Sequence, residues 1–280
     1  MFYLLKYFIQ MKILLNNSDL NEALSGISNL GFVPTMGSLH KGHLSLIKKS
    51  LKNCSNTLVS IFVNPTQFNN KKDYINYPRS LKKDLLILKK LKINFVYLPN
   101  KKDIYDSNIK KKPTLNKKDK IMCAKYRKGH FEGVIDVMDR LTKKIRPKMI
   151  FMGEKDYQQL YLVKKFIKKK YKSQIISCKT IRDKNKLALS SRNLLLKKKD
   201  QFNAGRIAQN LIFFKKKLTK QKNINIFIDN KKKELEELFD ISIEYLELRN
   251  SLNFKNTKKI KNSRLFISYY LNKIRLIDNF

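Results

Sequence analysis

The chain has 280 residues, of which 42% are hydrophobic and 30% are charged, so it can build a sizeable core, and we expect one large domain with a smaller one. Its 62 Lys and Arg residues outnumber its 22 Asp and Glu residues, which gives a net charge of +40. Such an excess suggests nucleic acid or an anionic membrane as a partner. However, no RNA-recognition signature, zinc-finger spacing or leucine heptad accompanies it, and we expect neither partner.

Strand-like apolar runs alternate with helical patterns over the first two thirds of the chain. Strands are predicted at 31–35, 57–64, 93–99, 148–153 and 174–181, and helices at 43–53, 80–91, 133–147 and 158–170. Ser80 is the expected N-cap of a helix that keeps Leu81, Leu85 and Leu88 on one side, and Pro147 ends the next helix. This alternation predicts β-α-β units, and therefore a parallel sheet.

The pattern changes after about Ile181. A helix is predicted at 201–218, followed by strand-like runs at 241–250, 263–271 and 274–280. We therefore expect a large α/β domain over residues 1–181 and a smaller α+β domain over residues 182–280. The Lys-rich stretch 110–120 is interpreted as a mobile loop, because the strand–helix alternation resumes after it.

The lysines occur in runs along the whole chain, together with many Asn and Ile residues. All three residue types have A/T-rich codons, so a mutational bias of the genome accounts for the charge better than a nucleic-acid surface does. The cysteines Cys54, Cys123 and Cys178 form no C-x-x-C pair, and we expect inert thiols in a reducing cytoplasm. The apolar residues 1–10 are too short to cross a bilayer, and Met11 is an alternative start.

The stretch VPTMGSLHKGH, residues 33–43, runs from a predicted strand into a predicted helix. Gly37 and Gly42 let the backbone approach a ligand closely, and the start of the helix favours phosphate. His40 and His43 could donate hydrogen bonds to phosphate oxygens and stabilise charge that develops on them. A bare H-x-G-H would more often fill an ordinary turn, but its place between a strand and a helix favours a ligand site.

The stretch FMGEKDYQQL, residues 151–160, also follows a predicted strand of the parallel sheet. Ligands of such sheets bind beyond the carboxyl ends of the strands, so this turn is expected at the same edge as the two histidines. Lys155 could hold phosphate and Asp156 could bind ribose hydroxyls. A charged surface loop is an equally good interpretation of this stretch alone.

Three further stretches carry polar groups of interest. In LSSRN, residues 189–193, the hydroxyls and the guanidinium suit a triphosphate, although a helix cap at Ser191 or Asn193 explains the stretch better when it is taken alone. In FVNPTQF, residues 62–68, Asn64 and Gln67 could hold hydroxyls or a carboxylate. The third stretch, YRKGHFEGV, contains His130 between two glycines. Five of the eight glycines and all three histidines fall in only three of these five stretches.

Taken together, these stretches and RLIDN near the C-terminus resemble the pantothenate synthetases (pantoate–β-alanine ligases) in order and spacing, from about Met11 to the end. H-x-G-H alone is shared with the wider superfamily of nucleotidylyl transferases and class I aminoacyl-tRNA synthetases. The resemblance implies a Rossmann-like parallel sheet with helices on both faces, a cytoplasmic enzyme and a homodimer. It also implies ATP-dependent condensation of pantoate with β-alanine through pantoyl adenylate, with Mg²⁺ as cofactor, releasing AMP and pyrophosphate.

The resemblance also implies roles for individual residues. His43, His40 and Lys155 would be catalytic, Gln67 and Gln159 would bind pantoate, with β-alanine also near Gln67, and Ile181 would contact adenine through its backbone. The segment 189–192 would close over ATP from the second domain, and no protein metal ligands are expected. The ATP-binding positions would be Met36, Gly37, Ser38, Leu39, His40, Lys41, Gly42, His43, Gly153, Glu154, Lys155, Asp156, Ile181, Leu189, Ser190, Ser191 and Arg192.

Three positions depart from the family pattern. Lys186 stands where glycine is usual, Lys128 where proline is usual, and Glu132 where a basic residue is common. Lysine disfavours the positive φ that glycine permits, so we expect an active enzyme of reduced stability. Two alternatives stay open at this point: another H-x-G-H enzyme, and a basic nucleic-acid-binding protein that uses the fold as a scaffold.

Overall fold

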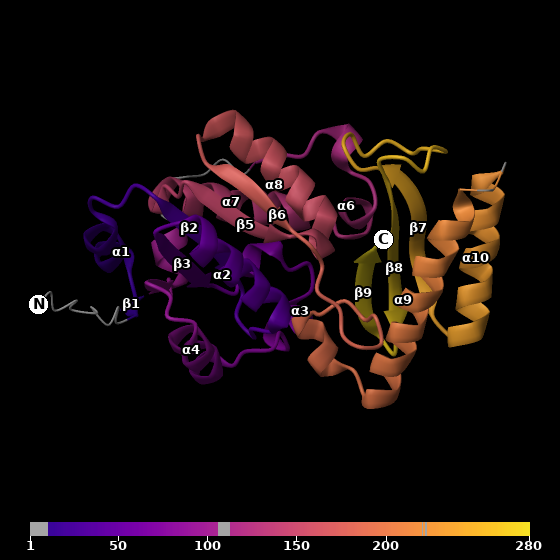
Figure 1. Cartoon of the computed structure of the whole chain (residues 1–280), viewed down its shortest axis with the longest axis horizontal. Helices are drawn as coiled ribbons and strands as arrows, with labels where there is room; N and C mark the ends of the chain where they lie inside the picture. Colours follow the sequence, from indigo (N-terminus) through magenta and orange to yellow (C-terminus); the bar gives the residue numbers. More distant parts are fainter. Residues whose placement is uncertain (1–10, 106–112, 220, 222) are drawn as a thin grey trace, which may run out of the picture. The chain divides into compact units, whose positions relative to one another are not determined.

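The computed structural model describes residues 11–105, 113–219, 221 and 223–280 (Figure 1). The chain forms two compact units. The first contains residues 1–117, 128–153 and 159–178, and the second contains 118–127, 154–158 and 179–280. The boundary expected after residue 181 lies three residues beyond the last of these breaks, and two short earlier segments also join the second unit. The apolar opening, 1–10, and the lysines 110–112 lie outside the described residues.

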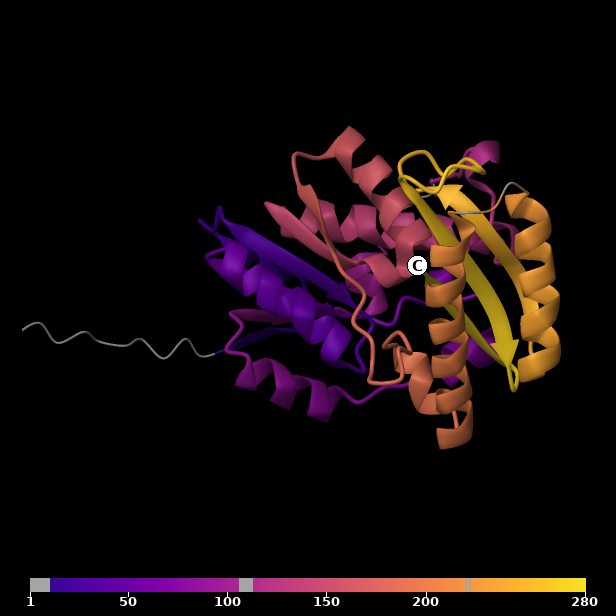
Figure 2. The same ribbon diagram turned by 45° about the vertical axis from the view of Figure 1, so that its right-hand side comes forward.

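The first unit is built on a six-stranded parallel sheet with the strand order β1-β4-β3-β2-β5-β6 (Figure 2). Its central strands are continuous apolar runs, as expected of strands covered on both faces. The strands are β1 (Lys12–Leu14), β2 (Leu30–Thr35), β3 (Asn56–Ile61), β4 (Phe95–Tyr97), β5 (Met149–Gly153) and β6 (Gln174–Cys178).

The strand order reverses direction beside β2: the chain moves outward through β3 and β4 on one side, and through β5 and β6 on the other. Right-handed crossovers that run in opposite directions place helices on opposite faces of the sheet. Ligands bind at such a reversal, beyond the carboxyl ends of the strands.

The helices of this part of the chain are α1 (Asn17–Leu24), α2 (Lys41–Asn53), α3 (Lys71–Ile75), α4 (Leu81–Lys90), α5 (Lys101–Ile104), α7 (His130–Ile145) and α8 (Tyr157–Lys170), with a 3₁₀ turn, η1 (Pro65–Gln67).

Several predicted boundaries differ from the structure in the first unit. The strand expected over 57–64 ends at Ile61, because Asn64 caps the 3₁₀ turn that follows it. Ser80 precedes α4 as predicted, but its side chain makes no capping hydrogen bond. Leu88 is buried in the core, whereas Leu81 is 47% exposed, so the three leucines do not share one buried side.

The second unit contains a three-stranded antiparallel sheet in the order β7-β8-β9. Its core is formed by aliphatic and aromatic side chains from the sheet and from two long helices, among them Leu211, Leu235 and Leu265, which are fully buried. Its elements are η2 (Lys117–Asp119), of which Lys117 belongs to the first unit, α6 (Cys123–Tyr126), η3 (Glu154–Asp156), η4 (Ser191–Leu195), α9 (Lys198–Leu218), α10 (Ile224–Phe239), β7 (Ser242–Asn250), β8 (Ser263–Leu271) and β9 (Ile274–Asn279).

Positive φ angles occur at ten residues other than glycine in the described part of the chain. Lysine occupies three of these positions: Lys92, Lys186 and Lys273. The φ angle of Lys186 is 71°, so the left-handed conformation expected at this departure from the family pattern is present. All three cysteines are buried and free, which confirms the expectation of unpaired thiols. No helix among the described residues is long and apolar enough to cross a bilayer.

Candidate active site

The turn after β2 is held by side chains from neighbouring elements of the first unit. The Thr35 hydroxyl donates to the carbonyl of Ser60 on β3 (2.7 Å) and accepts from the Gly37 amide (3.2 Å). Gly37 has φ +80°, and an added Cβ would lie 3.1 Å from both Asp84 Oδ2 and Ile61 Cγ2. Both the conformation and the close approach therefore require glycine at this position, which sequence reasoning attributed to ligand access alone.

Asp84 of α4 is the main anchor of this turn. Its carboxylate is 1% exposed and accepts hydrogen bonds from the amides of Ser38 and Leu39, both at 2.8 Å. Ser38 has φ 52°, a conformation that a non-glycine residue adopts only where its surroundings support it. A charged acceptor shared by two backbone amides supplies that support. This role could not be predicted from the sequence, because the partners of Asp84 lie 46 and 45 residues earlier.

The two histidines of H-x-G-H pack against each other at the start of α2. His40 is the N-cap residue, and its Nδ1 accepts from the Gly42 amide at 3.1 Å. His43 Nδ1 accepts from the His40 amide at 3.3 Å, and the two ring centroids are 4.0 Å apart. The imidazoles therefore bind the backbone amides of His40 and Gly42 at the start of the helix.

This capping determines the tautomer of both rings. A nitrogen that accepts a hydrogen bond from a backbone N–H carries no proton, so the proton of each neutral imidazole is on Nε2. A neutral ring is also favoured over a charged one at the positive end of a helix. The arrangement gives two N–H donors, His40 Nε2 and His43 Nε2, at the helix start that we predicted as the phosphate site.

Gln67, one of the two residues predicted to bind pantoate, lies in the first unit. Its side chain is 8% exposed; Nε2 donates to Met36 Sδ (2.7 Å) in the H-x-G-H turn, and Oε1 accepts from Asn64 Nδ2 (3.3 Å). Its backbone carbonyl lies 2.6 Å from Nδ1 of the buried His130, which must donate because a carbonyl only accepts. The structure therefore connects three of the predicted stretches: residues 33–43, 62–68 and 126–134.

Gly133 allows α7 to approach the η1 turn. A Cβ at this position would lie 2.3 Å from the carbonyl oxygen of Thr66, which is far too close for any side chain. The Gly133 carbonyl in turn accepts from Asn64 Nδ2 at 3.2 Å. The remaining predicted pantoate residue, Gln159, lies half-buried on α8 in the first unit.

The segment Glu154–Asp156 follows β5 and belongs to the second unit. Asn279 of β9 donates from Nδ2 to the carbonyls of Glu154 (2.8 Å) and Lys155 (2.9 Å). The Glu154 carboxylate pairs with Arg264 of β8 at 2.7 Å. The surface-loop interpretation is therefore inadequate for this segment, because β9 fixes its backbone and β8 binds its Glu154 side chain.

The stretch around Lys186 forms a tight turn in the second unit. The Leu189 amide donates to the carbonyl of Ile181 (2.9 Å), and the Lys186 amide donates to the carbonyl of Asp183 (3.0 Å). Arg182 closes this turn from outside: its guanidinium donates to the Lys186 carbonyl and makes two bonds to the Asp278 carboxylate, at 2.7 and 2.8 Å.

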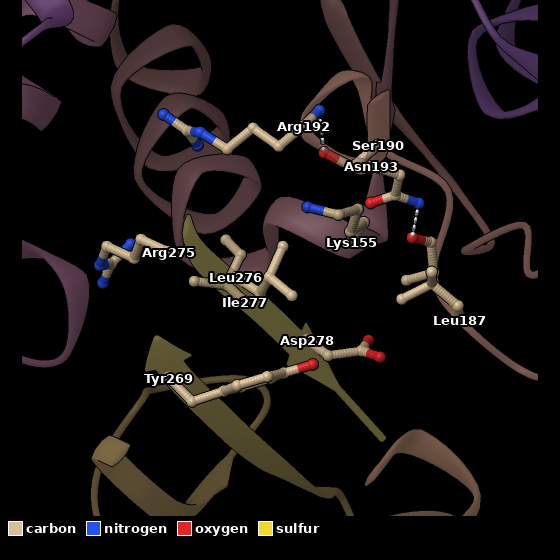
Figure 3. A pocket seen from close by; sticks show the side chains of 11 residues that line it. Lys155, Leu187, Ser190, Arg192, Asn193, Tyr269, Arg275, Leu276, Ile277 and Asp278 are labelled. Atoms are coloured by element: carbon tan, nitrogen blue, oxygen red, sulfur yellow. Dashed lines mark hydrogen bonds between the residues drawn. The ribbon is translucent and has the colours of Figure 1, made fainter. Parts of the chain in front are cut away.

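A pocket of the second unit is lined by Lys155, by residues between 187 and 193, and by residues of β8 and β9 (Figure 3). Three cationic side chains, those of Lys155, Arg192 and Arg275, line this pocket together with apolar side chains such as Leu276 and Ile277. The complete lining is Lys155, Leu187, Ala188, Ser190, Arg192, Asn193, Tyr269, Arg275, Leu276, Ile277 and Asp278.

The cationic side chains of the pocket differ in how far their charge is already neutralised. Arg275 is paired with Glu244 at 2.7 Å, whereas Lys155 Nζ lies 3.7 Å from Asp156 Oδ1. Ser190 caps the η4 turn by accepting from the Arg192 amide, so the capping role that we considered for Ser191 or Asn193 belongs to Ser190. The pocket combines positive charge with an apolar wall, as a nucleotide requires.

Sequence reasoning missed the residues that hold these segments in place, namely Asp84, Arg264 and Asn279, and it assigned no role to Arg275 of the pocket. Arg275 and Asn279 do lie in the RLIDN motif, which carried the resemblance but had no assigned role. Among the described residues, no group of three or more His, Cys, Asp or Glu side chains is placed to hold a metal ion.

The fold and the sites define the chain as an α/β nucleotide-binding protein with an H-x-G-H turn at the reversal of a parallel sheet. Comparison with known proteins gives the family. A family model described as pantoate–β-alanine ligase matches residues 12–280. The chain belongs to this family, and it is a ligase that joins pantoate to β-alanine.

Individual relatives agree over nearly the whole length. The pantothenate synthetase of Flavobacterium psychrophilum is 40% identical over 266 residues, covering 93% of this chain and 94% of the relative. The crystal structure of pantothenate synthetase from Thermus thermophilus has a TM-score of 0.89 at 26% identity, with 96% of this chain and 99% of that chain covered. The pantoate–β-alanine ligase of Francisella tularensis, complexed with β-γ ATP and β-alanine, has a TM-score of 0.83 at 35% identity, with 97% of each chain covered.

Proposed function

We propose that this ligase activates pantoate with ATP and makes pantothenate in two steps. The pantoate carboxylate attacks the α-phosphorus of ATP, which forms pantoyl adenylate and releases pyrophosphate. The amine of β-alanine then attacks the acyl carbon, an amide bond forms, and AMP leaves. The Francisella relative described as complexed with β-γ ATP and β-alanine supports this use of ATP.

The observation that carries the proposal is the geometry of His40 and His43. Both rings stand at the start of α2 with their Nδ1 atoms bonded to backbone amides, so Nε2–H is the donor that each can offer to a phosphate. Negative charge grows on the α-phosphate oxygens as the carboxylate attacks, and preorganised donors stabilise it in the transition state. The rest of the turn, Met36–Gly42, would bind ATP through its backbone.

Gln67 and Gln159 would bind pantoate, with β-alanine also near Gln67. The support for Gln67 is its contact with Met36, which joins it to the histidine turn. A thioether sulfur is a weak hydrogen-bond acceptor, so a carboxylate or hydroxyl oxygen of pantoate would be a better partner for Gln67 Nε2. Binding there would bring the nucleophile beside the turn that holds the phosphates.

In the second unit, Lys155 would neutralise phosphate charge, and Ser190, Ser191 and Arg192 would bind further phosphate oxygens. The positive pocket supports these roles, since Lys155, Ser190 and Arg192 line it and Ser191 follows Ser190 in the η4 turn. Glu154, Asp156 and Leu189 would complete the nucleotide site. Ile181 would contact adenine through its backbone; its carbonyl already accepts from the Leu189 amide, so its second lone pair would be used.

Mg²⁺ would enter with ATP. Mg²⁺ is commonly bound by substrate phosphates and waters with only one or two carboxylates, so its binding would need no dedicated cluster of protein ligands. The ion would neutralise charge on the leaving pyrophosphate. We also propose a cytoplasmic homodimer; the three free, buried thiols suit a reducing compartment, and the dimer rests on resemblance to the family.

The test is AMP release from Mg²⁺-ATP with pantoate and β-alanine, each omitted in turn, beside a His43→Ala variant. Release should need both substrates, and the variant should lose about 10²- to 10³-fold in rate, as expected when one transition-state donor is removed. Lys52→Ala, on the exposed last turn of the same helix, is the matched control and should keep the parent rate. A folded His43→Ala protein with the parent rate would refute the role of this turn.

A further inference from the structure

A row of polar side chains lies behind the Gln67 amide in the first unit. Tyr105 donates its hydroxyl to Asn64 Oδ1 at 2.7 Å, and Asn64 Nδ2 donates to Gln67 Oε1 at 3.3 Å. The Arg140 guanidinium lies 4.8 Å from the centre of the Tyr105 ring and pairs with Asp136 at 2.8 Å, with both charged side chains less than a tenth exposed. Asn64 and Gln67 were both considered from the sequence as ligand-binding groups, whereas Tyr105, Asp136 and Arg140 were not.

Two backbone groups identify which end of the Asn64 amide is the oxygen and which is the NH₂. The Thr66 amide can only donate, and it donates to the atom assigned as Oδ1 (3.2 Å); the Gly133 carbonyl can only accept, and it accepts from Nδ2 (3.2 Å). Asn64 therefore presents an N–H to Gln67. Gln67 must accept this hydrogen bond with its side-chain oxygen, and its own NH₂ therefore lies on the opposite side, against Met36.

Tyr105 makes the shortest hydrogen bond to Asn64 and is itself well anchored. Its hydroxyl also lies 2.9 Å from the Thr66 hydroxyl, and Arg140 covers its ring. Burial raises the pKa of Tyr105 to about 12, so the phenol keeps its proton and remains a donor at neutral pH.

We propose that Tyr105 is a positioning residue for pantoate: by holding Asn64, it keeps the NH₂ of Gln67, rather than its oxygen, directed at the substrate. The inference rests on the proposed role of Gln67. An NH₂ group selects a ligand with an oxygen acceptor, such as a carboxylate or a hydroxyl, and a reversed amide would repel it. Tyr105 therefore contributes to affinity for pantoate without touching it.

The experiment compares Tyr105→Phe with the parent enzyme in steady-state kinetics. Loss of one hydrogen bond in the row should raise the KM for pantoate about 5- to 10-fold, with kcat changed less than about threefold and the KM for ATP unchanged. Tyr97→Phe is the matched control, because it removes another phenol hydroxyl of the first unit, bonded to Asn17 at 2.8 Å. It should lower the melting temperature without changing the KM for pantoate.

A Gln67→Ala variant and the double variant separate the inference from the proposed function. Gln67→Ala should raise the KM for pantoate, and adding Tyr105→Phe should then raise it no further. An unchanged KM in Gln67→Ala would refute the pantoate role of Gln67 itself. If that role holds, the positioning role is wrong when Tyr105→Phe keeps the parent KM, or when it raises the KM equally with and without Gln67.

Discussion

Replacing Lys186 with glycine should make the enzyme more stable. Lys186 has φ 71°, which costs a residue with a Cβ roughly 1–2 kcal/mol relative to an ordinary conformation. Glycine removes that cost but adds about 0.5–1 kcal/mol through the greater freedom of the unfolded chain. The net gain in the free energy of unfolding is therefore about 0–1.5 kcal/mol, with about 0.75 kcal/mol at the centre of both ranges.

Nothing else in the structure opposes this substitution. The hydrogen bonds of Lys186 are made by its backbone, which donates to Asp183 and accepts from Arg182, and glycine keeps both. The side chain itself is exposed.

Calorimetry or circular dichroism would measure the change as a rise of about 1–3 °C in the melting temperature. Lys184→Gly is the control, since Lys184 is exposed in the same turn but is not among the residues with positive φ. That variant should melt lower than the parent. If Lys186→Gly melts at or below the parent temperature, the left-handed turn stores no strain that glycine can relieve.

Three further predictions concern the first unit. Asp84→Asn leaves one oxygen to accept hydrogen bonds from two amides, so the rate of AMP release should fall about 10- to 100-fold, with binding of β-alanine unaffected. A parent-like rate would show that the histidine turn keeps its conformation without the Asp84 carboxylate. Gly133→Ala forces α7 away from the Thr66 carbonyl and should cost about 1–3 kcal/mol of stability, read from urea unfolding, unless the helix shifts freely. Because the pKa of Tyr105 is about 12 when folded and about 10 when unfolded, its contribution to stability is complete below pH 10 and is lost as pH rises through 12. Tyr105→Phe should lose less stability than the parent over that interval, and equal losses would contradict the assignment.

The sequence predicted the parallel sheet well because buried parallel strands are uninterrupted apolar runs, as in β2 and β5. It missed α10, Ile224–Phe239. The buried residues of this helix are Ile224, Ile228, Leu235 and Phe239, so a gap of six residues that contains three consecutive lysines separates the two halves of the apolar face. A helix with so few apolar residues on its buried face has too weak a hydrophobic periodicity to be predicted from the sequence.

The candidate site was predicted in its ligand-facing residues but not in its supports. Short motifs such as H-x-G-H contain their functional groups within a few residues. The Asp84 carboxylate, in contrast, acquires its role only when the fold brings the amides of Ser38 and Leu39 next to it. The same holds for Asn279, whose two acceptors lie more than 120 residues earlier. Only the tertiary structure brings such partners together.

The two edges of the six-stranded sheet have a consequence for concentrated solutions of this enzyme. Within the described residues, β1 and β6 are the outer strands, and unpaired backbone groups on an edge strand can pair with another chain. Both strands are short, and lysines stand within or beside them: Lys12 in β1, and Lys172 and Lys179 on either side of β6. Like charges on two copies oppose edge-to-edge association, so the lysine excess acts as colloidal protection, and high salt should weaken it.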